Sequence, residues 1–219
     1  GAASAALLPH QPTLAHYAWL LESRAWRLAL NSLVVTGGTT LLALAAALPA
    51  AYALARLSFP RGLDGAFLMF VLLVKLSPPI VLAVPLYQVL RALGLLDTLA
   101  GLILACQIYA LPFAIWMFLG FVRDVPPAIE EAAMIDGAGI VRRLKDIVAP
   151  MIAPGIAATA VLVAIASWNE FLFAFLFIQS PEKFTLPTFI ATMINENETL
   201  WGRLMALGTV ASLPILALI

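Results

Sequence analysis

Of the 219 residues of this chain, 63% are apolar and 11% are charged, and the mean hydropathy is +1.02. Soluble globular domains average about 45–50% apolar and about 25% charged residues, so the composition predicts a protein that lies within a lipid bilayer. Basic and acidic residues number twelve each, and no basic tract exceeds Arg142-Arg143, which argues against nucleic-acid binding. The single cysteine, Cys106, excludes an internal disulfide and a cysteine-based zinc site.

Long apolar runs are expected to cross the membrane as helices, because a spanning segment must pair its own backbone groups and none of these runs alternates with period two. The runs cover residues 30–57, 65–90, 98–122, 150–178 and 202 onward. From Leu204 to Ile219 there are 16 residues, fewer than the roughly 20 that a span needs, so we expect the last helix to continue beyond Ile219. The sequence therefore predicts an all-α, polytopic membrane helical bundle with five visible spans.

Prolines interrupt every predicted span, and the second span carries three of them within eight residues: Pro78, Pro79 and Pro85. Proline cannot donate a backbone hydrogen bond, so a helix breaks or kinks there. A single proline is ordinary in a membrane helix. Three of them beside Lys75 and Ser77 favour a broken helix that lines a water-filled path.

Residues 123–149, between the third and fourth spans, are too polar to cross a bilayer, with four basic and five acidic residues among 27. The start of this segment predicts a short helix, with Asp124 as a candidate N-cap, proline in the first turn, and Glu130 and Glu131 near the positive end of the helix dipole. The glycines of residues 136–139 then allow a turn at positive φ. We expect a second helical stretch to follow this turn.

Small side chains on the first of these helices, those of Ala128, Ala132 and Ala133, suit insertion into a groove on another protein. The longer pattern consists of Glu131-Ala132-Ala133, Asp136-Gly137-Ala138 and Pro150. It resembles the cytoplasmic "EAA" loop of permease subunits of bacterial ATP-binding-cassette importers, which seats in a cleft of the ATPase subunit. In that family leucine usually precedes the proline, whereas this chain has Ala149.

Three further stretches narrow the resemblance to the second permease subunit of maltose-type, glycerol-phosphate-type and trehalose-type importers. They are residues 77–79 with 85–87 and 94–98, then residues 167–174, then residues 184–187. The match covers residues 31–219 and implies the type I ABC importer permease fold, with a sixth, N-terminal helix missing from this sequence. It also places residues 123–149 in the cytoplasm. The basic residues agree only weakly with this orientation, because six lie on that side of the membrane and five on the other.

The resemblance implies a domain organisation and a set of partners. Residues 1–28 form an external N-terminal segment, and residues 29–219 form the transmembrane permease domain, with the cytoplasmic coupling loop 123–149 and an external loop 179–201. The expected partners are a second permease subunit, two ATP-binding subunits and an extracytoplasmic solute-binding protein. ATP and Mg²⁺ would be used by the ATPase subunits, and the complex would lie in a bacterial or archaeal cytoplasmic membrane.

The expected coupling residues are those that match the loop pattern, namely Glu130, Glu131, Ala132, Ala133, Asp136, Gly137, Ala138 and Pro150. Polar residues within the spans, namely Lys75, Ser77, Asn169 and Glu170, are the candidates for the substrate pathway, because a polar residue at membrane depth marks a functional site by default. A structural role for Glu170, paired to a partner subunit or gating the outer end, remains the alternative.

No catalytic site is expected, because Glu131 and Asp136 lack a His, Cys or Ser partner in a defined arrangement. His10 and His16 have no carboxylate or cysteine companions, so we expect no metal site. No phosphate-binding loop of the G-x-x-x-x-G-K-[ST] type occurs, so any ATP chemistry belongs to a partner.

The predicted function is that of a non-catalytic permease subunit of an importer for a di- or oligosaccharide or glycerol phosphate. The alternative is an ATP-independent secondary transporter of a polar solute. No inverted repeat and no chain of titratable groups for proton coupling supports that alternative.

Overall fold

The computed structural model describes residues 14–23, 25–193 and 201–218, and every regular element among them is helical. The α-helices are α1 (Ala15–Glu22), α2 (Ala25–Arg56), α3 (Leu63–Leu76), α4 (Pro79–Ala92), α5 (Leu99–Asp124), α6 (Pro127–Ile135), α7 (Ile140–Arg143), α8 (Ala149–Met151), α9 (Ala153–Trp168), α10 (Leu172–Phe177), α11 (Leu186–Thr192) and α12 (Trp201–Leu218). Three short turns complete them, the 3₁₀ turns η1 (Pro60–Gly62) and η3 (Pro181–Lys183) and the π-helical turn η2 (Leu144–Val148). The all-α prediction is confirmed.

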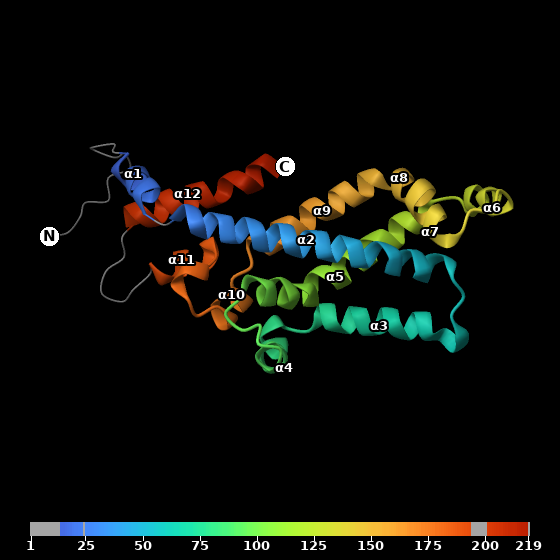
Figure 1. The fold of residues 1–219 in the computed structure, drawn as a ribbon, viewed down its shortest axis with the longest axis horizontal. Helices are drawn as coiled ribbons and strands as arrows, with labels where there is room; N and C mark the ends of the chain where they lie inside the picture. Colours follow the sequence, from blue (N-terminus) through green and yellow to red (C-terminus); the bar gives the residue numbers. More distant parts are fainter. Residues whose placement is uncertain (1–13, 24, 194–200, 219) are drawn as a thin grey trace.

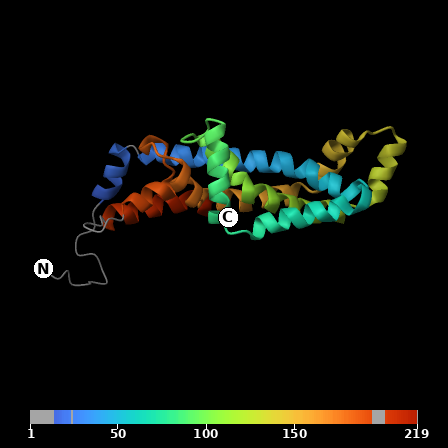
Figure 2. The same cartoon turned by 90° about the horizontal axis from the view of Figure 1, so that it is seen from below.

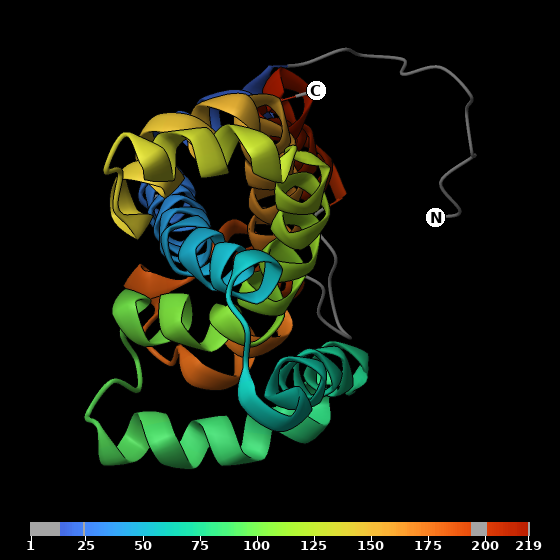
Figure 3. The same ribbon diagram turned by 90° about the vertical axis from the view of Figure 1, so that its right-hand side faces the viewer.

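Helices α2, α5 and α9 run alongside one another and form the centre of an elongated bundle (Figure 1). The loop that contains α6 and α7 lies at one end, which we call the α6 end. Helices α1 and α11 lie at the other, which we call the α11 end. Helix α12 packs against α1 at the α11 end. The view along the bundle shows α3 and α4 to one side of the three central helices (Figure 3).

Alanines allow α2 and α5 to approach closely. Ala43, Ala47 and Ala51 are completely buried and recur every fourth residue, so they lie on one face of α2. They share an apolar cluster with Ala110 and Ala114 of α5. Small residues at a helix interface let the backbones approach, which is how membrane helices gain packing energy without a hydrophobic driving force.

The second predicted span is broken, as the three prolines indicate, and it is not a single helix through residues 65–90. Helices α3 and α4 meet at an angle of 103°, so that α4 stands across the bundle axis (Figure 2). Ser77 has an extended backbone with ψ of 134° because it precedes a proline, and Pro78 precedes another. Helix α3 alone is 14 residues, about 21 Å, which is shorter than a span.

The fourth predicted span is also divided. A 79° bend separates residues Ile140–Met151 from α9, and α9 ends at Trp168, ten residues before the end of the predicted run. The chain then restarts as α10 at Leu172. The expectation of one helix over residues 150–178 is therefore wrong.

The first and third predicted spans are confirmed as continuous helices. By length and composition, the described residues contain two helices able to cross a membrane, Trp26–Arg56 and Leu99–Asp124, or four spans if each bent pair counts as one. The apolar helix Trp201–Ala217 is shorter.

Candidate functional site

Helix α6 begins two residues later than the sequence pattern suggests. Asp124 is the last residue of α5 and does not cap α6, so its assignment as the N-cap is wrong. Pro126 occupies the cap position without a side-chain hydrogen bond, and Pro127 is the first helical residue. A residue before proline is restricted to extended backbone, so Val125 and Pro126 stay extended and the helix starts only at Pro127.

Glu130 anchors α6 to the rest of the protein. It is only 3% exposed, and its carboxylate accepts hydrogen bonds from the Tyr52 hydroxyl at 2.6 Å and from Arg56 Nε at 2.6 Å. The other arm of Arg56, Nη2, donates to the carbonyl oxygens of Val122 and Val125 at 2.8 and 2.6 Å. We call these three side chains, Tyr52, Arg56 and Glu130, the Glu130 anchor.

The anchor fixes α6 to the ends of both α2 and α5. Tyr52 and Arg56 stand one turn apart on α2, and Arg56 also binds the carbonyl of Val122 in the last turn of α5 and that of Val125 just after it. A buried carboxylate is tolerated when it is paired and hydrogen-bonded, as this one is. The loop pattern groups Glu130 with residues that face a partner, whereas in the structure its side chain points inward. The sequence feature that could have indicated this inward position is the four-residue spacing of Tyr52 and Arg56 at the end of α2.

The remaining loop residues lie at the surface. Glu131, Ala132, Asp136, Gly137 and Pro150 are exposed, and Ala133 and Ala138 are half-buried. Large apolar side chains beside them are also exposed, namely those of Ile129, Met134, Ile135, Ile140 and Val141. Ile135 is the extreme case at 89% exposed. The α6 end therefore presents an apolar surface around small and acidic residues, which is typical of an interaction site.

The turn after α6 is a Schellman motif. Gly137 has φ of +78°, its N–H donates to the carbonyl of Met134 at 3.0 Å, and the N–H of Ala138 donates to the carbonyl of Ala133 at 2.9 Å. This pair of bonds closes a helix end on a residue in the left-handed conformation, which glycine adopts without strain. The predicted glycine turn is confirmed.

Lys75 and Ser77 lie at the break between α3 and α4. Lys75 is exposed, and its Nζ lies 5.1 Å from the centroid of the Phe113 ring. The Ser77 hydroxyl donates to the Leu73 carbonyl at 2.8 Å, which also accepts the backbone N–H of Ser77 at 3.0 Å. Neither side chain makes a hydrogen bond or ion pair with Asn169 or Glu170 in the part of the chain that the structure describes.

Asn169 and Glu170 lie at the break between α9 and α10. The Glu170 carboxylate accepts from the N–H groups of Phe173 at 2.7 Å and Ala174 at 3.0 Å, so it caps the start of α10. Asn169 is exposed and donates to the Ile165 carbonyl at 2.8 Å. Glu170 thus has a structural role, of a kind that the sequence did not suggest.

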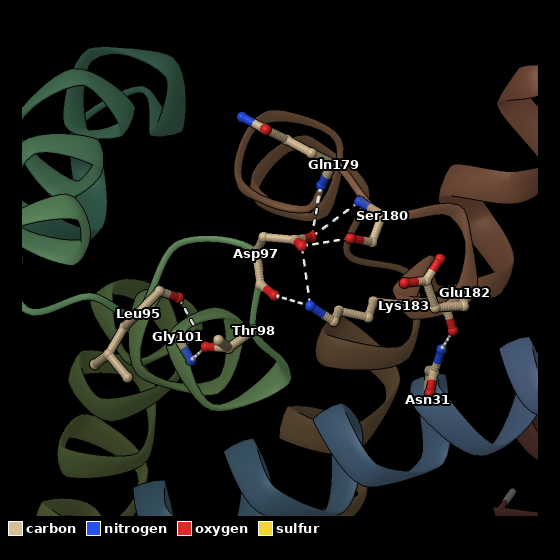
Figure 4. A network of polar contacts seen from close by, with 9 residues as sticks. All are labelled: Asn31, Leu95, Asp97, Thr98, Gly101, Gln179, Ser180, Glu182 and Lys183. Carbon is tan, nitrogen blue, oxygen red and sulfur yellow. Dashed lines mark hydrogen bonds and ion pairs between the residues drawn. The ribbon is translucent and has the colours of Figure 1, made fainter.

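A polar network at the α11 end centres on Asp97 (Figure 4). Its carboxylate accepts from the backbone N–H groups of Gln179 and Ser180, both at 2.9 Å, from the Ser180 hydroxyl, and from Lys183 Nζ at 2.9 Å. Lys183 also donates to the Asp97 carbonyl at 2.7 Å. Asp97 joins the link between α4 and α5 to the segment that follows α10, across more than 80 residues of sequence.

The hydrogen bonds to Asp97 favour its ionised carboxylate. Burial raises its pKa, but the bonds from Ser180, Lys183 and Gln179 outweigh burial and hold the pKa of this carboxyl well below its ordinary value of 3.8. Asp97 also has φ of 55°, a left-handed conformation that aspartate tolerates better than most residues. The sequence placed this residue within a motif without assigning it a role.

The same segment is bound to α2 on its other side. Asn31 Nδ2 donates to the carbonyls of Glu182 and Phe184 at 2.9 and 3.0 Å, and the N–H of Leu186 donates to the Ser32 hydroxyl at 2.8 Å. Residues 194–200 of the predicted external loop, and His10 of the N-terminal segment, lie outside the described residues. 

The sequence matches a known family over most of its length. The profile of the family described as "Binding-protein-dependent transport system inner membrane component" matches residues 43–219. The putative ABC transporter permease protein ORF1 of Streptomyces antibioticus is 39% identical over 213 residues, covering 96% of this chain and 91% of that protein. The trehalose transport system permease protein SugB of Mycobacterium tuberculosis is 35% identical, covering 97% of this chain and 78% of that protein.

A solved structure shares the fold. A chain of a bacterial ABC transporter involved in the import of the acidic polysaccharide alginate matches with a TM-score of 0.80 and 23% sequence identity. The match covers 96% of this chain and 79% of that one. The type I permease fold is confirmed by this likeness.

Replacing Glu130 with alanine should strongly destabilise the α6 end. The change leaves the Arg56 guanidinium and the Tyr52 hydroxyl without their buried partner, a loss of about 3–5 kcal/mol for a broken buried pair. We expect a lower Tm for the detergent-purified protein and faster protease cleavage within residues 123–149. Glu131→Ala is the matched control, because Glu131 is exposed and its removal should change stability by less than about 0.5 kcal/mol. Equal melting of the two variants would contradict the anchor.

Acid should loosen the segment that Asp97 holds. Because the folded pKa lies below the ordinary value, the stabilisation is fully present above about pH 4 and is lost as the pH falls through the folded pKa. Hydrogen exchange at the Gln179 and Ser180 amides should therefore accelerate in acid relative to an Asp97→Asn protein, which cannot titrate there. The same pH profile in both proteins would show that ionised Asp97 does not hold the segment.

Proposed function

Because the chain belongs to the family of binding-protein-dependent transport system inner membrane components, we propose that it is one of two permease subunits in an ATP-driven sugar importer. It is an inner-membrane ABC transporter permease, and members of this family act in carbohydrate transport. The proposed partners are the second permease, two ATPase subunits that use ATP and Mg²⁺, and an extracytoplasmic solute-binding protein. This chain supplies no catalytic group to the reaction.

The proposed cargo is a di- or oligosaccharide or glycerol phosphate. The trehalose named for one relative and the alginate named for the structural neighbour support a carbohydrate, and neither fixes which one. A solute rich in hydroxyl groups needs hydrogen-bond donors and acceptors along its path.

The exposed surface of the α6 end carries the proposal of coupling to an ATPase. We assign this end to the cytoplasm and assign docking to Glu131, Ala132, Asp136 and the exposed apolar residues around them. The Glu130 anchor supports coupling, because a docked α6 held by Tyr52 and Arg56 moves together with the ends of α2 and α5. Pro150, where the chain leaves the loop for α9, is assigned a second mechanical connection, between the loop and α9.

The proposed substrate path runs past the two helix breaks. Lys75 and Asn169 are exposed there and are assigned the polar contacts with the solute. Ser77 and Glu170 bond to backbone groups of α3 and α10, which supports a positioning role for these two side chains.

Co-purification of the full-length protein from its native membrane tests the assembly. We expect mass spectrometry of the detergent extract to identify an ATPase, a second permease and a binding protein, and the ligand of that binding protein would name the solute. A chain that purifies alone and transports solute in proteoliposomes without ATP would overturn the proposal in favour of a secondary transporter.

Substituting Gly137 with valine should uncouple transport while leaving the complex assembled. A β-branched residue is strained at φ of +78°, so the Schellman turn distorts and α6 loses its orientation toward the ATPase. Uptake of the solute into proteoliposomes should fall at least tenfold. Gly139→Val is the matched control, because Gly139 has φ of −71° and open space around its Cα, and it should retain uptake. Undiminished uptake by the Gly137 variant would refute the role of this turn.

A further inference from the structure

A layer of buried polar side chains crosses the centre of the bundle. Among the described residues, eight buried side-chain nitrogen or oxygen atoms lack a hydrogen-bond partner, and six of these are oxygens on the three central helices. They belong to Thr36, Thr39 and Thr40 of α2, Gln107 and Tyr109 of α5, and Ser167 of α9. We call these six residues the polar layer.

The six residues lie at one level because they separate the same two apolar clusters on every helix. One cluster lies toward the α11 end and the other toward the α6 end. The residues that flank the layer are Val35 and Ala43 on α2, Cys106 and Ala110 on α5, and Phe173 and Val163 on α10 and α9. The polar layer is therefore a feature of the packed bundle, and not a scatter of unrelated hydroxyl groups.

Contacts within the layer leave oxygen atoms that need donors. Gln107 Nε2 donates to the carbonyls of Thr39 at 3.2 Å and Ile103 at 3.1 Å, so both its hydrogens are used and Oε1 faces no donor. The Tyr109 ring stacks on Phe173 with centroids 6.3 Å apart, which fixes the direction of its hydroxyl. That hydroxyl lies beside Ser167 and Cys106 without a hydrogen bond of normal geometry.

Without bound water, the polar layer would lower the stability of the folded protein. Each buried polar group left without a partner costs about 1–3 kcal/mol, and hydrocarbon around the bundle offers no substitute. Water has the hydrogen-bonding capacity that the polar layer needs. It donates two hydrogen bonds, accepts two, and is stably held where two to four polar groups meet. Gln107 Oε1 requires a donor, whereas the hydroxyl groups can donate or accept.

We propose that the polar layer is an internal water-binding site, in which ordered water molecules bridge α2, α5 and α9. The helix breaks lie at the same level. Helix α9 ends at Trp168, directly after Ser167, and Lys75 of the last turn of α3 contacts Phe113, one turn from Ala110. Water bridges can exchange partners, so the central helices can shift at this level without leaving a polar group unpaired.

A Thr39→Val protein tests whether the Thr39 hydroxyl is bonded to water, because the sign of the change in stability differs between a water-bonded and a dry hydroxyl. Valine has nearly the shape of threonine, so removal of a water-bonded hydroxyl should lower the Tm of the detergent-purified native assembly by about 2–4 °C. Thr39→Ser retains the hydroxyl and should melt closer to the unaltered protein than Thr39→Val does. Removal of a dry, unpaired hydroxyl would instead leave the Tm unchanged or raise it, and either result overturns the proposal.

Thr159→Val provides the matched control. Thr159 is also completely buried in α9, but its hydroxyl already donates to the Gly155 carbonyl at 2.7 Å and needs no water. Its replacement should lower the Tm by less than the replacement of Thr39. A drop as large as that of Thr39→Val would show that loss of any buried hydroxyl has this effect and would remove the support for bound water.

Radiolytic labelling tests the water directly and does not depend on a variant. Short X-ray pulses convert bound water to hydroxyl radicals, which oxidise the side chains that touch it. Cys106 is completely buried and adjoins Thr39 and Tyr109, so it should be oxidised, whereas the equally buried Phe118 in the apolar cluster should not. An unlabelled Cys106, or a Tm that depends on the presence of sodium or potassium ions, would overturn water as the occupant.

Discussion

In a bilayer every backbone N–H and C=O group must find its partner within the protein, and that constraint decides where these helices can end. At two of the interior breaks a nearby side chain bonds to backbone groups at the helix end. Ser77 bonds to the carbonyl of Leu73 where α3 stops, and the Glu170 carboxylate receives the first N–H groups of α10. Ser77 and Glu170 therefore serve the backbone where these helices end.

Continuous apolar runs made α2 and α5 predictable, and the prolines at residues 78 and 79 made the break after α3 predictable. The direction taken by α4 was not, because a proline removes a hydrogen bond without choosing an angle. Asp124 was mistaken for a cap, because the sequence shows an acid before prolines but not where the preceding helix stops. The loop pattern and its glycine turn could be predicted, since Gly137 occupies the position that needs a positive φ.

Long-range partners account for what the sequence could not supply. Glu130 is separated from Arg56 by 74 residues and Asp97 from Lys183 by 86, so neither pair leaves a local pattern. Two acidic neighbours, Glu130 and Glu131, look equivalent in the sequence. Helical geometry points one at α2 and the other at the surface, and that difference appears only when α6 is packed.

Helix α2 holds a segment at each of its ends, Glu130 through Arg56 near one and the carbonyls of Glu182 and Phe184 through Asn31 near the other. It is unbroken over 32 residues, about 48 Å, even through Pro49. Such a rod acts as a lever: a tilt of about 5° about one end displaces the other by about 4 Å over that length. A displacement of α6 would therefore be transmitted by α2 to the segment that follows α10.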